Sequence, residues 1–221
     1  MLLGRDLIKS YGSQFALRQA NIELTPGSVV MLLGRNGSGK STLLNILALA
    51  QAPDSGSVMV DELSGRAART AIGFAPQEIA LFEELSVEEN LRCWCPLPAN
   101  AARRRVDDLL ERLDMTADRR KLLRNLSGGQ KRRVNLAAAL MGEPRYLLLD
   151  EPLAGVDDDS ERRILELLAD YARQGLGVLI SSHQPRLLRG LADQALVLER
   201  GETVFAGRAA DYFSGLMERE L

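Results

Sequence analysis

The stretch that decides the fold is Val29-Val-Met-Leu-Leu-Gly-Arg-Asn-Gly-Ser-Gly-Lys-Ser-Thr42. Its first five residues have the length and branching of a buried strand, and residues 41–49 have the pattern of a helix. Between them lies Gly34-x-x-x-x-Gly39-Lys40-Ser41, the pattern of a phosphate-binding loop, where glycines let successive N–H groups converge on an anion. Lys40 would reach the β- and γ-phosphates, and the Ser41 hydroxyl would ligate Mg²⁺. We therefore expect this stretch to bind a nucleoside triphosphate.

The composition limits the class of protein. The 221 residues suffice for one large domain or for one domain with a subdomain. With 28 basic and 30 acidic residues the net charge is -2, so no global charge favours nucleic-acid binding. No apolar run approaches the roughly 20 residues that cross a bilayer, and no signal peptide is visible. We expect a soluble, cytoplasmic chain that would reach a membrane only through a partner.

Cys93 and Cys95 flank Trp94. Two cysteines are too few for a disulfide framework, and a chain with one histidine cannot easily complete a zinc site. We expect two ordinary thiols in a reducing compartment.

The order of the predicted elements indicates the fold class. Residues 1–28 alternate between short extended runs and turns, as in a small antiparallel sheet. Strands are predicted at residues 57–61, 72–75, 146–149 and 178–180, helices at 131–141 and around 164–171, and a hairpin at 195–205. Strands that alternate with helices predict an α/β fold with a mainly parallel sheet and helices on both faces.

From about residue 78 the sequence becomes helical. Ser86-Val-Glu-Glu89 fits a capping box. Further on, one helical face carries the apolar residues Val106, Leu109, Leu110 and Leu113. The preceding Arg103-Arg-Arg105 is expected to be a solvated face. Residues 78–125 are therefore a candidate helical subdomain.

Polar residues follow two of the predicted strands. Asp150 ends the strand at 146–149, where a P-loop fold holds Mg²⁺, although any Asp at a strand end would look similar. Glu151 is placed to accept a proton from an attacking water. His183 is the only histidine and follows the strand at 178–180, at the sheet edge that binds ligands. This position favours a γ-phosphate contact over a structural role.

A second anion-binding segment is Leu126-Ser-Gly-Gly-Gln130. Ser127 caps the following helix, and Gly128 and Gly129 leave its first N–H groups open. A monomer with one triphosphate has no evident use for two such sites. Here the chain resembles the ATP-binding cassette (ABC) ATPase family, whose signature is Leu-Ser-Gly-Gly-Gln, and the resemblance covers nearly the whole chain.

The resemblance implies a fold and a role for each matching residue. The fold is a P-loop NTPase core with an antiparallel β subdomain (about residues 1–77 and 146–221) and an inserted helical subdomain (about 78–130). The residues implied to bind ATP are Tyr11, Gly34, Arg35, Asn36, Gly37, Ser38, Gly39, Lys40, Ser41 and Thr42. Tyr11 would stack on adenine, or it could equally be a packed turn residue. The implied catalytic residues are Glu151, His183, Gln77 and Lys40, and the implied Mg²⁺ ligands are Ser41, Gln77 and Asp150.

The resemblance also implies partners. In a head-to-tail dimer, the signature residues of one subunit would cover the ATP of the other, namely Ser127, Gly128, Gly129 and Gln130. Gly155-Val156-Asp157 resembles the D-loop of the family. Such an ATPase drives transport through separate membrane-spanning subunits and lies on the inner face of the membrane. Leu81, Phe82 and Trp94 would contact that partner, or pack inside the subdomain.

The wording of residues 76–91 resembles export-type ATPases more than importers, so export is the expected direction of transport. Two alternatives to a transport function remain. One is a soluble ABC protein acting on DNA or ribosomes, which usually shows a coiled coil, tandem cassettes or a basic extension. The other is a non-hydrolysing nucleotide switch, which is expected to lack Glu151 or His183; both residues are present.

Overall fold

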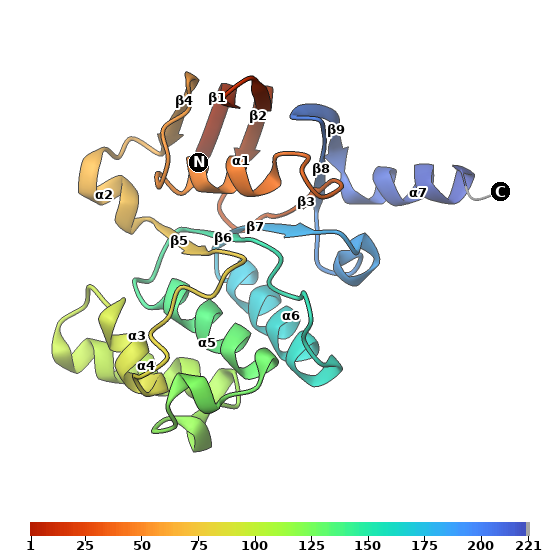
Figure 1. The fold of residues 1–221 in the computed structure, drawn as a ribbon. Coiled ribbons are helices and arrows are strands. Elements are labelled where there is room, and N and C mark those ends of the chain that lie inside the picture. The colour runs from red at the N-terminus through yellow and green to blue at the C-terminus, as the bar shows by residue number, and fades with distance from the viewer. Residues whose placement is uncertain (220–221) are drawn as a thin grey trace.

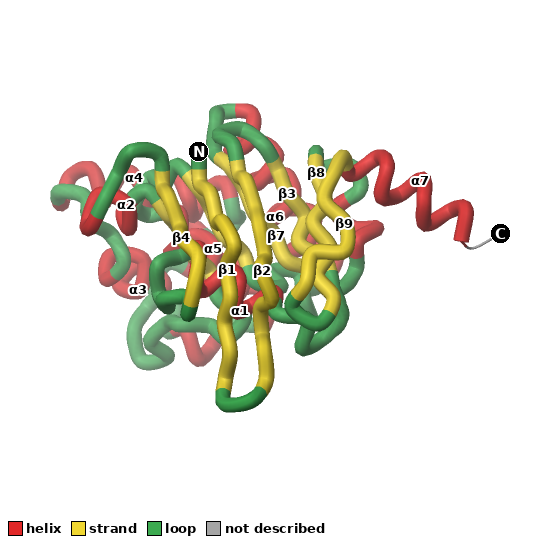
Figure 2. Tube along the Cα trace, turned by 90° about the horizontal axis from the view of Figure 1, so that it is seen from above, coloured by secondary structure: helices red, strands yellow, loops and turns green. Residues whose placement is uncertain are grey.

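Two sheets organise the chain in the computed structural model, which describes residues 1–219 (Figures 1 and 2). The smaller sheet is antiparallel, with the order β2-β1-β4, and consists of β1 (Leu2–Tyr11), β2 (Gln14–Leu24) and β4 (Ser55–Val60). The larger sheet has the order β5-β6-β7-β3-β8-β9. Its strands are β3 (Val29–Leu33), β5 (Ile72–Ala75), β6 (Tyr146–Leu149), β7 (Gly177–Ser182), β8 (Gln194–Glu199) and β9 (Glu202–Arg208). All neighbours pair in parallel except β8 and β9, which confirms the predicted mainly parallel sheet.

Helices cover both faces of the larger sheet (Figure 1). α1 (Lys40–Leu47) lies between the two sheets, whereas α5 (Gly128–Leu140) and α6 (Asp158–Arg173) pack on the opposite face. Beside α5 lie α3 (Val87–Cys93) and α4 (Ala99–Arg112). The other helical segments are α2 (Gly65–Thr70), η1 (Thr116–Asp118), η2 (Leu123–Asn125), η3 (Pro185–Leu188) and α7 (Ala209–Arg219), which projects from the body.

β3 contributes to two hydrophobic cores because successive side chains of a strand point to opposite faces. Val29, Met31 and Leu33 join the core formed with α5 and α6. Val30 and Leu32 join the core formed with α1 and the antiparallel sheet. A strand that is apolar on both faces needs cover on both, which is why this strand reads as an uninterrupted apolar run.

Several element boundaries differ from the sequence prediction. α5 begins at Gly128, three residues before the predicted start, because Ser127 and Gln130 form a capping box that places both glycines in the first turn. The capping box of Ser86 and Glu89 is present as predicted. α2 and α7 were not predicted. No helix within residues 1–219 is both long enough and apolar enough to cross a membrane.

The predicted solvated face at residues 103–105 is wrong for Arg105. Arg103 and Arg104 are exposed, but the Arg105 guanidinium donates to the Leu140 carbonyl oxygen through Nε at 3.3 Å and through its terminal nitrogen at 3.0 Å. It also lies over the ring of Tyr171, 5.4 Å from the centroid. Arg105 therefore ties α4 to α5 and α6. The division into a core and a helical subdomain near residues 77, 130 and 146 stays a prediction.

Candidate functional site

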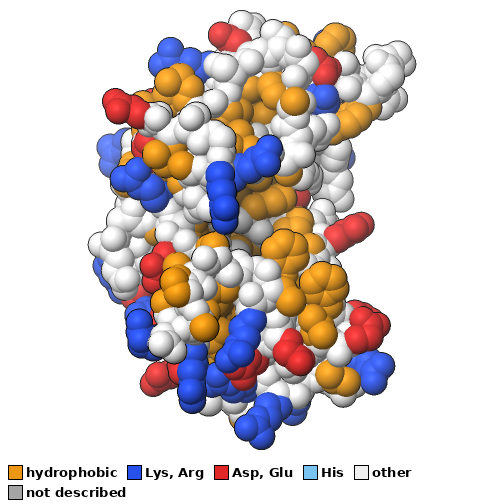
Figure 3. Space-filling model, turned by 90° about the vertical axis from the view of Figure 1, so that its left-hand side faces the viewer, with side chains coloured by type: hydrophobic (Ala, Val, Ile, Leu, Met, Phe, Trp, Pro, Cys, Tyr) orange, Lys and Arg blue, Asp and Glu red, His pale blue; other side chains and the backbone are white. Residues whose placement is uncertain are grey.

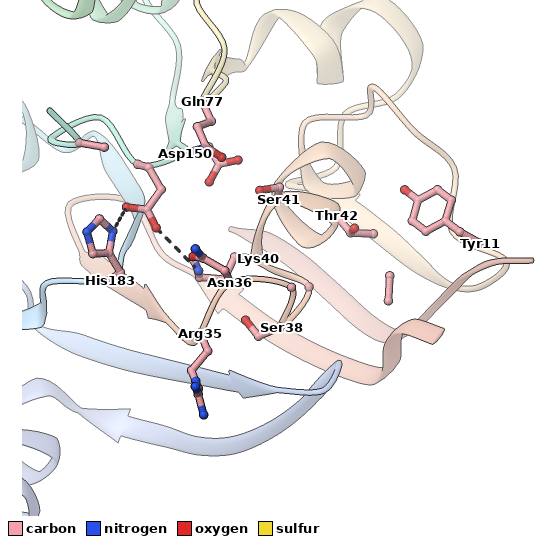
Figure 4. Close-up of a pocket in the computed structure, with 15 residues that line it drawn as sticks. Tyr11, Arg35, Asn36, Ser38, Lys40, Ser41, Thr42, Gln77, Asp150 and His183 are labelled. Carbon is pink, nitrogen blue, oxygen red and sulfur yellow. Dashed lines mark hydrogen bonds and ion pairs between the residues drawn. The ribbon is translucent and has the colours of Figure 1, made fainter. Parts of the chain in front are cut away.

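A pocket of about 870 Å³ lies at the carboxyl ends of the parallel strands (Figure 4). β3, β5, β6 and β7 all end at this edge, so the segments that follow them converge there, as parallel sheets dictate. The pocket is lined by Tyr11, Ala16, Arg35, Asn36, Gly37, Ser38, Gly39, Lys40, Ser41, Thr42, Gln77, Asp150, Glu151, Ala154 and His183. The structure thus brings together the residues predicted to bind ATP, Gly34 excepted, and the predicted catalytic and Mg²⁺-binding residues.

The loop that precedes α1 depends on its glycines. Gly34, Gly37 and Gly39 have φ angles of 150°, 78° and 107°, in the region that favours glycine. A Cβ on Gly34 would collide with the Leu198 carbonyl oxygen, and one on Gly39 with the Ala16 carbonyl oxygen. α1 then begins without a side-chain cap, so its first N–H groups are available to an anion.

Lys40 brings a cation into the pocket. Its side chain is 7% exposed, and Nζ donates a hydrogen bond of 2.8 Å to the Gly34 carbonyl oxygen. The same nitrogen lies 3.7 Å from Glu151 Oε1. A cation held between the loop and a carboxylate is positioned to attract phosphate oxygens.

Two buried carboxylates follow β6. Asp150 and Glu151 are 3% and 7% exposed. Glu151 has a φ of 49°, an unfavourable backbone conformation for a residue with a side chain, of the kind that concentrates at functional sites. Its Oε2 lies 2.8 Å from Nδ1 of His183, whose side chain is half exposed at the end of β7. Glu151 therefore contacts both Lys40 and His183, as the dashed lines in Figure 4 show.

Gln77 lies two residues beyond β5, and its side chain points towards Asp150 (Figure 4). The backbone around it is held by α5, because the Asn135 side chain donates to the Pro76 carbonyl oxygen at 3.2 Å and the Arg132 guanidinium donates to the Gln77 carbonyl oxygen. Burial lowers the pKa of Arg132, and the negative charges of Asp150 and Glu151 partly counteract that effect.

Tyr11 occupies the end of the pocket away from His183 (Figure 4). Its side chain is 53% exposed, and its hydroxyl donates to Gln51 Oε1 at 2.9 Å. It is therefore not a packed turn residue, and its ring is accessible for stacking.

The signature residues do not line this pocket. Ser127 is the N-cap of α5, where its hydroxyl accepts from the Gln130 N–H at 3.2 Å and its own N–H donates to Gln130 Oε1 at 2.9 Å. Gly129 packs against the start of α6, where Asp157 accepts hydrogen bonds from the Ser160 N–H at 2.9 Å and the Ser160 hydroxyl at 3.0 Å. These bonds lower the pKa of Asp157.

The region predicted to contact a membrane partner has an apolar hollow of about 430 Å³. Leu81 and Trp94 line it together with the Arg69 side chain. Leu81 is partly buried, whereas Phe82 and Trp94 are 50% and 48% exposed. Figure 3 shows hydrophobic side chains gathered around a hollow on this side of the molecule, with basic side chains at its edge. Leu81 thus packs inside, and the two aromatic side chains face outwards.

Some residues of the site escaped prediction from the sequence. Ala16 and Ala154 line the pocket without any chemical signal in their residue type. Arg132 and Asn135 lie three positions apart, on one face of α5, and this spacing is the only sign of their shared target. Ser181 contacts both buried carboxylate residues, although the sequence marks it only as a small residue before His183.

The pocket fits a phosphate chain with a divalent cation. Lys40 and the start of α1 offer positive charge and N–H donors to phosphates. The Ser41 hydroxyl, the Gln77 amide oxygen and the Asp150 carboxylate line the same pocket, and hard oxygen ligands of this kind suit Mg²⁺.

Comparison with known proteins gives concordant matches. Residues 17–154 match the family model described as ABC transporter. The lipopolysaccharide export system ATP-binding protein LptB of Acidithiobacillus ferridurans is 34% identical, over 100% of this chain and 95% of that protein. The linearmycin resistance ATP-binding protein LnrL of Bacillus subtilis is 34% identical, over 98% of this chain and 72% of that protein. A dimeric ATP-binding cassette, in a post-hydrolysis state bound to ADP and Pi, superposes with a TM-score of 0.85 at 27% identity, over 95% of this chain and 99% of that chain.

Proposed function

The chain belongs to the ABC transporter family and is an ATP-binding subunit that hydrolyses ATP, and we propose that it drives export through separate membrane-spanning subunits. The observation that carries the proposal is the single pocket in which Lys40, Asp150, Glu151 and His183 meet. The direction is supported by the relative from Acidithiobacillus ferridurans, which is named for lipopolysaccharide export.

In the proposed mechanism, the phosphates of ATP lie along the loop at residues 34–42. Lys40, which now bonds the Gly34 carbonyl oxygen, turns to the β- and γ-phosphates. The N–H groups at the start of α1 add their partial positive charge. Mg²⁺, held by Ser41, Asp150 and Gln77, would supply charge neutralisation at the phosphates. Tyr11 would stack its exposed ring on the adenine.

Glu151 is the proposed general base. Its carboxylate accepts a proton from a water in line with the γ-phosphate, and the buried position keeps it in a fixed orientation. His183 holds one carboxylate oxygen through Nδ1, and its exposed ring reaches towards the γ-phosphate as charge develops there. Lys40 lies near Oε1 of Glu151, whereas His183 contacts Oε2. The two contacts therefore orient the Glu151 carboxylate from both sides.

The site is proposed to be completed by a second cassette. Ser127 and Gly129 lie at the N-terminus of α5, where an anion can bind, yet they do not line the pocket of their own chain. In a head-to-tail dimer they would cover the ATP of the partner, and each subunit would return the contact. The dimeric cassette bound to ADP and Pi supports such an assembly.

The membrane partner is proposed to dock at the hollow lined by Leu81, Trp94 and Arg69. A helix with an apolar face fits such a groove. Exposed aromatic side chains are typical anchors of an interface, which supports Phe82 and Trp94 as contacts. Trp94→Ala should abolish co-purification of a multi-span protein from detergent-solubilised membranes. Val204→Ala, which truncates another exposed apolar side chain on β9, should leave it unchanged.

The hydrolytic role is tested with Glu151→Gln. This variant keeps the size of the side chain but removes the base, so it should bind ATP, form a dimer on size-exclusion chromatography and turn over very slowly. Hydrolysis at the wild-type rate in this variant would refute the assignment of Glu151. Capture by the wild-type chain of DNA or ribosomes, with no membrane protein, would instead favour a non-transport function.

A further inference from the structure

Ser181 joins the two buried carboxylate residues. It lies near the end of β7 and has no exposed surface. Its hydroxyl donates to Asp150 Oδ1 at 2.6 Å and accepts from the Glu151 N–H at 2.9 Å. One hydroxyl therefore bonds a side-chain atom of one residue and a backbone atom of the next.

These two contacts fix different parts of the pocket. A serine hydroxyl has one proton, and here that proton is directed to Asp150, which orients the carboxylate and leaves Oδ2 without a bond to Ser181. The bond at 2.6 Å has the length of a charge-assisted hydrogen bond. The Glu151 N–H is buried and needs an acceptor, since an unpaired buried N–H is unfavourable.

The second contact also supports a strained backbone. Glu151 has a φ of 49°, which residues with a side chain rarely adopt and which persists only where neighbours hold it. This turn aims the Glu151 side chain back at Lys40 and His183. A shift of that backbone would move the carboxylate away from both.

We propose that Ser181 is a positioning residue for hydrolysis, which sets the Asp150 carboxylate and the Glu151 backbone through one hydroxyl. This inference rests on the proposed roles of Asp150 and Glu151. The neighbouring Ser182 provides a matched control, because it is also buried but its hydroxyl accepts from the Gln184 N–H at 2.9 Å. If Ser181 only filled space, the rate of hydrolysis would depend on the shape of residue 181. If Ser181 is a positioning residue, the rate depends on its hydroxyl.

The test compares Ser181→Thr with Ser181→Val, which have nearly the same shape and differ in the hydroxyl. ATP hydrolysis with Mg²⁺ is measured together with hydrogen exchange of the Glu151 amide. Ser181→Val should lower kcat by roughly 10–100-fold, as loss of a group that orients a metal ligand does, and should speed the exchange of that amide. Ser181→Thr keeps the hydroxyl, so it should keep kcat close to the wild-type value and retain the slow exchange of the Glu151 amide. Ser182→Ala, the control, should also retain the kcat of the wild type and the slow exchange of the Glu151 amide.

A third readout concerns nucleotide binding. Affinity of Ser181→Val for a fluorescent ADP analogue should fall when Mg²⁺ is present and stay unchanged in EDTA. The reason is that Ser181 would affect nucleotide binding only through Asp150, which is a proposed Mg²⁺ ligand. Equal kcat values and equal amide exchange for the Thr and Val variants would overturn the proposal. A wild-type chain without ATPase activity would refute the proposed function instead, and the amide exchange would still decide whether Ser181 positions Glu151. Circular dichroism verifies that each variant folds, and Ser181→Ala replaces the pair if both β-branched residues prevent folding.

Discussion

Alanine substitution separates the two glycines of the signature segment. A Cβ on Gly129 would lie 2.5 Å from Asp157 Oδ2 and 2.7 Å from Ser160 Oγ, which are hydrogen-bonded to each other at the start of α6. A Cβ on Gly128 would meet nothing within 4 Å. Gly129→Ala should therefore destabilise the folded chain, whereas Gly128→Ala should not.

The magnitude follows from the difference between the two variants. Both substitutions occur in the first turn of α5, so both gain about 0.5–1 kcal/mol of helix propensity. Only Gly129→Ala overpacks its surroundings, which is unfavourable by about 1–3 kcal/mol. The middle of that range is about 2 kcal/mol, and it corresponds to a Tm difference of about 4–8 °C for a chain of this size.

Differential scanning calorimetry of the two purified variants without nucleotide measures this difference directly. Gly129→Ala should melt about 4–8 °C below Gly128→Ala, and Gly128→Ala should melt at or slightly above the wild-type temperature. Melting of the two variants within 1 °C of each other would refute the steric reasoning. An ATPase assay should not separate the two variants in the same way as melting does. Both glycines are proposed to face the ATP of the partner, so both variants should hydrolyse ATP slowly.

Further predictions concern charge and pH. Lys40→Ala should weaken binding of a fluorescent ATP analogue by about tenfold or more, because a charge-assisted contact to phosphate is lost; unchanged affinity in a titration would contradict this. Hydrogen bonding from Arg119 lowers the pKa of Glu88 from its ordinary value of 4.5, so that contact stabilises the fold at neutral pH, and this stabilisation is lost progressively as pH falls below 4.5. Chemical denaturation of Glu88→Gln should show a flatter loss of stability in acid than the wild type. Burial, with the hydrogen bond to Asp61, raises the pKa of Tyr146 to about 12 from an ordinary value of 10.0, so stability should fall as pH rises from about 10 to 12. Tyr146→Phe should lack that alkaline loss in the same measurement.

The sequence predicts best three short apolar strands of the larger sheet. β3, β5 and β6 have the predicted bounds, because an apolar run flanked by turn residues leaves little choice of register. α5 is less well predicted, since glycines disfavour helices and only the Ser127 cap places two of them in its first turn. Arg105 was assigned to solvent because its contacts with Leu140 and Tyr171 come from segments distant in the sequence.

The composition of the pocket also follows largely from the sequence. Residues that follow parallel strands, directly or through a short loop, must gather at one edge of the sheet, so Lys40, Asp150 and His183 could be placed near one another. The contacts within the pocket could not be placed in this way. The hydroxyl of Ser181 and the left-handed backbone of Glu151 depend on side-chain direction and on one φ angle, and neither leaves a periodic signal.

α5 connects parts of the molecule that the sequence treats as separate motifs. At its start, Gly129 leaves no free space beside Asp157. Within the next two turns, Arg132 and Asn135 hold the backbone carbonyls of Gln77 and Pro76. Because a helix moves as a rigid element, a shift of its first turn towards a partner's ATP must strain or break these contacts, or carry both loops with it. The chemistry around Gln77 and the packing around Asp157 are therefore mechanically linked through the same helix that presents the signature residues.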